Sequence, residues 1–450
     1  MLPPLTKAVD VPNAPAIIDG QKSLTYADLQ QAVAATERPA SQFAIMSAPP
    51  SADSVIKVIA CLQPNPLPPP RMRGGHRGGN IVACPINPHL PPNAIQRITH
   101  LLSSGAAVIS PAPLRDSHDP IHPDTPAVII TTSGTTAEPK LALLSYGNLY
   151  YSACAANNNM PLNPGDRWLL SLPLYHVAGL GIMFRCLLAG AAIVVPGTQR
   201  QLADTILEQG ITHISLVSTQ LYRLLQDVDG LQALKKLKAI LLGGGPMPRP
   251  LIERAIQENL PIHTSYGLTE TASQITATRP DDPPEARFTS GAPLTQDTVA
   301  ISSEGEILVR GNTLFLGYLQ HGTLNRPLTP DGWFQTGDLG RLDSHGRLTV
   351  LGRKDNMFIC AGENIYPEEV ERALEAIPGI LQAIVIPVDD PERGHVPVAY
   401  VRTDPDYIIE PARLMAHLSK NLLRHKIPTQ FRPWPVHLPD SAKVNRRSIK

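Results

Sequence analysis

The segment "KAILLGGGPMPRPLIERAIQEN", Lys238–Asn259, decides the fold class. It begins with a short apolar run typical of a buried strand, continues with a turn rich in Gly and Pro, and ends with the spacing of a helix. The same order recurs where "HISLVST" (213–219) precedes "QLYRLLQDV", and "IHTSYGLTE" (262–270) ends in a similar turn, after which we expect another helix. This alternation predicts α/β layers with parallel strands. Ligands of such sheets bind beyond the carboxyl ends of the strands, so these turns mark the expected site.

The composition favours a globular protein that acts on small molecules. A chain of 450 residues is long for one core, and Lys plus Arg equals Asp plus Glu at 39 each, without the basic excess typical of a nucleic-acid binder. Five cysteines without a C-x-x-C pair, and a start that lacks the regions of a signal peptide, predict a cytoplasmic protein. The apolar stretch Gly179–Gly197 contains Arg185, which favours a buried helix followed by a strand over a membrane span.

The pattern of elements changes after about residue 285. "TVAISSEGEILVRG" and "GRLDSHGRLTVLGRKD" have the turn residues of hairpins, and a helix, two strands and another helix follow from about residue 367. We predict an N-terminal domain of layered sheets and helices with a β-rich portion over residues 1–352, and a small mobile α+β domain over 353–450. Residues 62–80, rich in Pro and Gly, are expected to form an exposed loop.

A second informative stretch is "TTSGTTAEPK", Thr131–Lys140, which follows the apolar run Pro126–Ile130. Successive backbone N–H groups in such a turn can form a concavity for an anion, to which the hydroxyls add donors and Lys140 adds charge. The stretch is not a Walker A loop, because G-x-x-x-x-G-K-[ST] does not occur in the chain. From these residues alone, an ordinary turn and a phosphate cradle both remain open.

The whole chain resembles the acyl-adenylate-forming enzymes, a family that includes acyl-CoA synthetases, luciferases and adenylation domains. The resemblance implies an enzyme that transfers AMP from ATP to a carboxylate, releases pyrophosphate, and then passes the acyl group to the thiol of CoA. The signatures that carry it occur in the family's order: "TTSGTTAEPK", "LPLYHVAG" (172–179), "LLGGGPMP" (241–248), "SYGLTE" (265–270), "DGWFQTGDLG" (331–340), "GRKDNMFICAGENIYPEEVE" (352–371) and "AKVNRR" (442–447).

The resemblance assigns the nucleotide to residues of several signatures. Those that would hold ATP are Thr132, Ser133, Gly134, Thr135, Thr136, Lys140, Gly243, Gly244, Gly245, Tyr266, Gly267, Asp338 and Arg353. The hydroxyl-rich loop would bind the β- and γ-phosphates, Tyr266 would stack on adenine, and Asp338 would accept the ribose hydroxyls. Glu270 would hold Mg²⁺, a hard cation that prefers oxygen ligands, and Thr269 would contact the α-phosphate.

The same resemblance assigns residues to two half-reactions. Lys443 would be the adenylation lysine, and His176 would lie between the acyl site and the thiol path. Asp355 would be the hinge of the C-terminal domain. Rotation about it would bring Ala361 and Gly362 to the active site as part of the CoA tunnel.

Two longer stretches, "WLLSLPLYHVAGLGIMFRCLLAGAAIVV" (168–195) and "THISLVSTQLYRLL" (212–225), resemble a member of the family that activates an aromatic keto-acid with two carboxylates, and Arg185 lies in the first. An unpaired charge within an apolar helix is costly, so the side chain either reaches solvent or meets an anion. The resemblance implies an acid with a second carboxylate, and we predict that Arg185 pairs with the one that is not activated. Gln220 and, more weakly, Arg223 are further candidates for the acyl pocket.

Three departures leave alternatives open. Ala137, Ala361 and Ala442 stand where the family has Gly, and an Ala costs on the order of 1 kcal/mol wherever φ is positive. A ligase for another aryl or short acyl acid, an enzyme that loads a carrier-protein thiol, and a non-catalytic nucleotide-binding protein are the alternatives. Retention of Glu270, Asp338 and Lys443 argues against the last. A homo-oligomer is compatible with the sequence.

Overall fold

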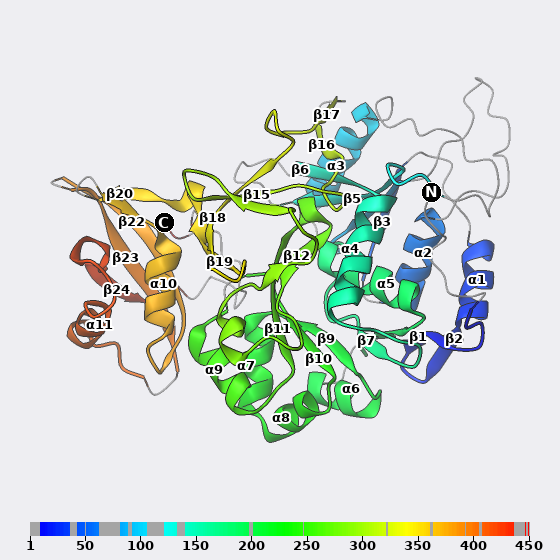
Figure 1. Cartoon of the computed structure of the whole chain (residues 1–450), viewed down its shortest axis with the longest axis horizontal. Coiled ribbons are helices and arrows are strands. Elements are labelled where there is room, and N and C mark those ends of the chain that lie inside the picture. The colour runs from blue at the N-terminus through cyan, green and yellow to red at the C-terminus, as the bar shows by residue number, and fades with distance from the viewer. Residues whose placement is uncertain are drawn as a thin grey trace.

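The described part of the chain forms four β-sheets with helices packed around them (Figure 1). The structure is a computed structural model, and it describes residues 10–36, 43–49, 51–62, 82–88, 92–105, 121–132, 140–197, 201–245, 247–320, 323–360, 363–391, 393–404, 407–435, 446 and 449. Several predicted features lie outside these residues: Ser133, Gly134, Thr135, Thr136, Ala137, Ala361, Gly362, Ala442, Lys443 and all but the first residue of the loop 62–80.

The largest sheet has the order β13-β12-β11-β10-β9-β7-β8-β1-β2, and its centre is parallel. Apolar side chains such as Leu216, Ile240 and Ile252 bury its strands against the helices that follow them. Its strands are β1 (Pro15–Asp19), β2 (Lys22–Thr25), β7 (Arg167–Leu169), β8 (Ala192–Val195), β9 (His213–Leu216), β10 (Ala239–Leu242), β11 (Ile262–Leu268), β12 (Ser273–Ala277) and β13 (Ala292–Pro293).

Two of the three predicted strand–turn–helix units are present. Helix α7 (Ser218–Gln226) follows β9, and α9 (Arg249–Gln257) follows β10. The prediction of a helix after β11 is wrong. A 3₁₀ turn, η1 (Thr269–Thr271), leads into β12, which pairs antiparallel with β11. The chain can reverse here because Ala272 and Ser273 adopt positive φ values of 53° and 108°.

The second sheet joins the predicted phosphate loop to a distant part of the sequence. Its order is β17-β16-β6-β5-β4-β3, and Thr132 pairs with Lys140 where the β5–β6 hairpin closes. Strand β16 pairs with β6, although about 175 residues separate them in the chain. The bounds are β3 (Phe43–Ser47), β4 (Val82–Ile86), β5 (Pro126–Thr132), β6 (Lys140–Ser145), β16 (Gly317–Gln320) and β17 (Thr323–Asn325).

The predicted membrane-like stretch is a buried helix followed by a strand. Helix α5 (Val177–Ala189) packs against α4 (Tyr146–Asn159), and β8 follows it (Figure 1). No helix in the described residues combines the length and the apolar character needed to cross a bilayer. The remaining helices of this part are α1 (Tyr26–Ala35), α2 (Ala52–Leu62), α3 (Pro92–Gly105), α6 (Leu202–Glu208), α8 (Val228–Lys235) and the 3₁₀ helix η2 (Pro284–Phe288).

Both predicted hairpins are present in a third sheet, of order β14-β15-β18-β19. Strands β14 (Val299–Ile301) and β15 (Glu306–Val309) form one, and β18 (Phe334–Leu342) and β19 (Leu348–Arg353) form the other. The 3₁₀ helix η3 (Lys354–Asn356) follows β19. The domain boundary at residues 352 and 353 stays a prediction.

The C-terminal segment has a sheet and a hydrophobic cluster of its own, at the end of the molecule far from the N-terminus (Figure 1). Side chains such as Val370, Val385 and Leu414 form this cluster. Its elements are β20 (Phe358–Cys360), β21 (Glu363–Ile365), α10 (Pro367–Glu375), β22 (Ile380–Asp390), β23 (Gly394–Thr403), α11 (Pro411–Leu418), η4 (Arg424–Lys426) and β24 (Gln430–Pro433).

Candidate active site

Three predicted nucleotide-binding residues meet between β11 and the β18–β19 hairpin. The Tyr266 hydroxyl donates to Oδ2 of Asp338 at 2.7 Å, and Nη1 of Arg353 lies 3.1 Å from Oδ1 of the same carboxylate. Burial raises the pKa of Asp338, and the Arg353 guanidinium opposes that rise. Burial, reinforced by Asp338, raises the pKa of the Tyr266 hydroxyl, so this hydroxyl remains a donor. The group presents an acidic acceptor, an aromatic ring and a cation side by side.

Glycines shape the turn after β10. Gly244 has a φ of +83°, a left-handed conformation that favours glycine. A Cβ on Gly243 would lie 2.9 Å from Oγ of Ser265 on the neighbouring strand. The turn of Gly243, Gly244 and Gly245 therefore lies close to β11, with no side chains of its own.

The turn after β11 carries Glu270 and Thr269 on a constrained backbone. A Cβ on Gly267 would lie 1.9 Å from the carbonyl oxygen of Ser273, so only glycine permits this approach. Oγ1 of Thr271 accepts from the Leu268 N–H at 2.9 Å and donates to the Ser273 carbonyl at 2.8 Å. With Ala272 and Ser273 at positive φ, the turn has the backbone strain that is common at functional sites.

The Glu270 carboxylate lies near the end of the β5–β6 hairpin, which bears the predicted phosphate loop. Oε1 of Glu270 accepts from the Tyr318 hydroxyl at 2.5 Å, and the Lys140 ammonium lies 5.2 Å from the centroid of the Tyr318 ring. Tyr318 was not among the predicted site residues, although it is the one polar side chain in the apolar run "LFLGYL" (314–319). A carboxylate, threonine hydroxyls and an ammonium group are the donors and acceptors that suit a triphosphate with Mg²⁺, so these residues fit that ligand.

Arg185 is buried in α5, with only 1% of the residue exposed. Its Nη2 donates to Oγ of Ser273 at 3.2 Å, and its guanidinium carbon lies 5.3 Å from the centroid of the Trp168 ring. Burial lowers its pKa to about 10. Among the described residues, Nε has no hydrogen-bond partner and no carboxylate forms an ion pair with the guanidinium. The side chain does not reach solvent, and its pairing with an anion stays a prediction.

The other predicted residues occupy different positions. His176 is the residue immediately before α5, at its N-cap position; it is exposed, and its ring centroid lies 4.7 Å from that of Tyr175. Oε1 of Gln220 accepts from the Val217 N–H at 3.1 Å, so this amide caps α7. Arg223 lies in the last turn of α7, and Asp355 in η3 accepts from Nε of Arg353 at 3.1 Å.

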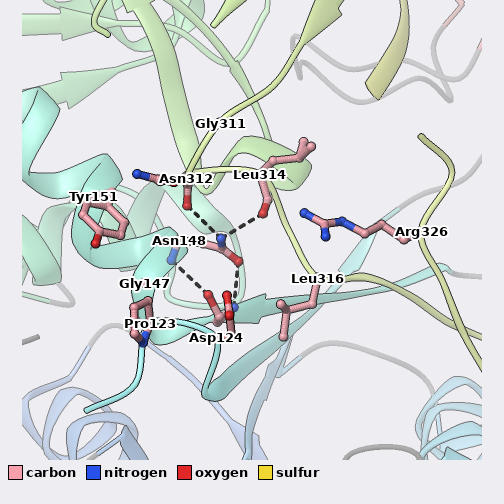
Figure 2. Close-up of a pocket in the computed structure, with 11 residues that line it drawn as sticks. Pro123, Asp124, Gly147, Asn148, Tyr151, Gly311, Asn312, Leu314, Leu316 and Arg326 are labelled. Atoms are coloured by element: carbon pink, nitrogen blue, oxygen red, sulfur yellow. Dashed lines mark hydrogen bonds between the residues drawn. The ribbon is translucent and has the colours of Figure 1, made fainter. Parts of the chain in front are cut away.

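A separate pocket of about 110 Å³ lies beside α4 (Figure 2). Asn148 connects α4 to the segment of residues 312–314, because its Nδ2 donates to the carbonyls of Asn312 at 2.9 Å and Leu314 at 2.8 Å. The next residue, Phe315, donates its N–H to the Glu270 carbonyl at 2.8 Å. None of the predicted site residues lines this pocket, but its wall fixes the chain that leads to Tyr318.

Comparison with known families now defines the class of protein. Residues 96–319 match the AMP-binding enzyme family, and residues 369–443 match the AMP-binding enzyme C-terminal domain. The chain belongs to this family of AMP-binding enzymes, which confirms the resemblance of the sequence signatures. Its mixed α/β fold, with a large N-terminal and a small C-terminal domain, is likewise that of the family.

Individual relatives are similar over most of the chain. The 2-succinylbenzoate–CoA ligase of Bacillus licheniformis is 38% identical over 324 residues, 69% of this chain and 66% of that protein. The Salmonella typhimurium enzyme of the same name is 40% identical over 322 residues, 71% of this chain and 67% of that protein. The aligned segments thus span about two thirds of these relatives.

Solved structures extend the similarity to nearly the full length. The o-succinylbenzoate CoA synthetase of Bacillus subtilis, in complex with its acyl-adenylate intermediate, superposes with a TM-score of 0.82 at 29% identity, covering 100% of this chain and 98% of that one. A structure of the same enzyme with ATP and a magnesium ion gives a TM-score of 0.79 at 29% identity, covering 98% and 97%.

Proposed function

We propose that this protein is an ATP-dependent ligase that converts o-succinylbenzoate into its acyl-adenylate and then into o-succinylbenzoyl-CoA, a step of menaquinone biosynthesis. The observation that carries the proposal is Arg185, a buried guanidinium with no carboxylate partner among the described residues. Ser273 connects it to the turn that bears Glu270. A dicarboxylic acid could pair one carboxylate with Arg185 while the other reaches the nucleotide.

The first half-reaction brings an anionic nucleophile to an anionic phosphate. The oxygen of the acid's carboxylate attacks the α-phosphorus, an acyl–phosphate bond forms, and pyrophosphate leaves. Lys140 and the backbone N–H groups of the loop after Thr132 would neutralise the phosphate charge, and Thr269 would donate to the α-phosphate. Mg²⁺ bound by Glu270 and phosphate oxygens would supply further charge neutralisation.

The ribose and adenine would be held by the group around Asp338. Its two carboxylate oxygens, now engaged by Tyr266 and Arg353, are suited to accept a pair of vicinal hydroxyls. Binding of the ribose in this way requires the hydrogen bond from Tyr266 to Asp338 to break. The Tyr266 ring would then be free to pack on adenine beside the glycine turn.

The second half-reaction would use another pose of the C-terminal domain, residues 353–450. Arg353 contacts Asp338 in the β18–β19 hairpin and Asp355 in η3, so one side chain spans the proposed hinge. In one pose Lys443 would reach the adenylation site. In the other, Ala361 and Gly362 would line the path of the CoA thiol, which attacks the acyl carbon and displaces AMP. The use of ATP and CoA, together with five free cysteines, supports a cytoplasmic location.

A pyrophosphate-release screen tests the proposal. The purified protein with ATP, Mg²⁺ and a panel of aryl and short acyl acids should release pyrophosphate most efficiently with o-succinylbenzoate. Release should be limited to about one equivalent per protein without CoA and should turn over with CoA. A higher kcat/KM for another acid would refute the substrate, turnover only with a carrier-protein thiol would refute CoA, and no release with any acid would refute the ligase.

A further inference from the structure

Tyr318 lies between two groups that the proposed adenylation needs. Its hydroxyl donates to Oε1 of Glu270, and the Lys140 ammonium lies over its ring, 5.2 Å from the centroid. These side chains come from η1 and β6, and β16, which bears Tyr318, pairs directly with β6. From this arrangement we infer that Tyr318 is a positioning residue, which fixes the Glu270 carboxylate relative to Lys140 for binding of the metal–triphosphate. This inference rests on the proposed function of the site.

The Tyr318 ring is itself rigidly held. It is buried, and the ring of Phe315 packs edge-on against it with centroids 4.8 Å apart. Phe334 in turn packs edge-on against Phe315, with centroids 5.4 Å apart. Aromatic rings in such contacts have few alternative rotamers, so the hydroxyl has a defined position.

The backbone that leads to Tyr318 is held by hydrogen bonds to two other elements. Asn148 of α4 donates to the carbonyls of Asn312 and Leu314 (Figure 2), and the Phe315 N–H donates to the carbonyl of Glu270 in η1. Gly317 has a φ of +146°, and a Cβ there would lie 2.5 Å from the Asn325 carbonyl oxygen. Both the backbone and the side chain of Glu270 are thus bound to the same segment, residues 312–318.

The chemistry of the pair is compatible with metal binding by Glu270. The tyrosine hydroxyl is the donor and the Glu270 carboxylate the acceptor of the hydrogen bond between them. The hydrogen bond engages Oε1 and leaves Oε2 without a partner among the described residues. A carboxylate held through one oxygen presents the other to a cation with little loss of side-chain freedom on binding.

The test compares Tyr318→Phe with Tyr26→Phe. Tyr26 is a matched control, because its buried hydroxyl donates to the carbonyls of Cys186 at 2.9 Å and Ala191 at 2.8 Å, outside the site. Calorimetric titration measures ATP binding at several Mg²⁺ concentrations, and unfolding temperatures report on the fold. Tyr318→Phe should raise the Mg²⁺ concentration for half-maximal ATP binding about tenfold, as expected for one hydrogen bond to a charged group. Tyr26→Phe should leave it unchanged.

Two further measurements separate positioning from a general structural effect. Thioester formation from supplied acyl-adenylate and CoA involves no metal–triphosphate, so Tyr318→Phe should leave its rate within about twofold of the wild type. In a Glu270→Gln background, adding Tyr318→Phe should produce no further shift in the Mg²⁺ dependence.

An unchanged Mg²⁺ midpoint in Tyr318→Phe, equal losses in both half-reactions, or an additive effect with Glu270→Gln would overturn the inference. The titration also distinguishes it from the proposed function. If the wild type binds ATP with Mg²⁺ but activates no acid, the ligase proposal fails while the role of Tyr318 is still decided by the same binding curves.

Discussion

Replacing Arg185 by Met should stabilise the ligand-free protein and remove the preference for an acid with two carboxylates. The guanidinium is 1% exposed, and burial lowers its pKa to about 10, which corresponds to a penalty of about 3 kcal/mol for the charged form. Its described contacts, the Ser273 hydroxyl and the Trp168 ring, offset only part of that penalty. Met is unbranched and uncharged but shorter than Arg, so the space left by the guanidinium cancels part of the gain, and we expect a free energy of unfolding higher by about 1 kcal/mol.

The same substitution should weaken binding of the dicarboxylate. Leaving a carboxylate without its charged partner in a buried pocket costs about 2–3 kcal/mol, which corresponds to a rise in KM of roughly 30- to 150-fold. An analogue that lacks the spared carboxylate has no such contact to lose, so its KM should change by less than about threefold. Arg185→Lys keeps the charge but loses the planar guanidinium, so its KM for the dicarboxylate should lie between those of the wild type and of Arg185→Met.

Thermal unfolding measures the stability, and pyrophosphate release with both acids measures the two KM values. Arg167→Met is a matched control, because Nη1 of Arg167 donates to the Gln209 carbonyl at 2.6 Å, away from the site. Equal rises in KM for both acids would remove Arg185 from the acyl pocket. A lower unfolding temperature in Arg185→Met would show that Ser273 and Trp168 already compensate the charge, and the reasoning from burial would be wrong.

Three further outcomes are expected. Lys443→Ala should abolish pyrophosphate release yet preserve thioester formation from supplied acyl-adenylate; survival of both half-reactions would remove Lys443 from its role. Gly267→Ala should eliminate adenylation, because its Cβ would collide with the Ser273 carbonyl. Gly346→Ala, whose φ of +72° is strained for alanine but whose Cβ meets nothing within 4 Å, should retain activity. Burial raises the pKa of Glu375 to about 8, above its value in the unfolded chain, so folding takes up a proton and stability falls as the pH rises toward 8. Glu375→Gln should make the unfolding temperature depend less on pH in this range. An unchanged slope of unfolding temperature against pH would contradict the prediction.

Local patterns in the sequence predicted local structure well. The apolar runs before Gly243 and Ser218 became parallel strands followed by helices, and the Glu-Gly and His-Gly turns became hairpins. These elements depend on residues within about ten positions of each other, where periodicity and turn chemistry are informative. The family signatures added what local patterns do not contain, namely the order of the motifs and the chemistry that they imply.

The errors and omissions arise where contacts distant in sequence decide the structure. The two residues with positive φ after β11, Ala272 and Ser273, are not glycines, so the sequence does not mark this reversal of the chain. Their backbone conformation follows from the pairing of β12 with β11 and β13. Tyr318 could not be connected to Glu270, because the pairing of β16 with β6 is not visible in either segment alone. The partner of Arg185, Ser273, was missed for the same reason.

The turn after β11 links the two ends of the proposed reaction. Glu270, which contacts Tyr318, and Ser273, which contacts Arg185, are three residues apart, and the backbone between them is held by Thr271 and by two left-handed residues. A backbone so constrained has few ways to move one of these side chains without moving the other. The spacing between the bound acid and the metal–triphosphate would then be set by the main chain of one short turn. Such an arrangement would suit an in-line attack, for which a small error in the position of the carboxylate is costly.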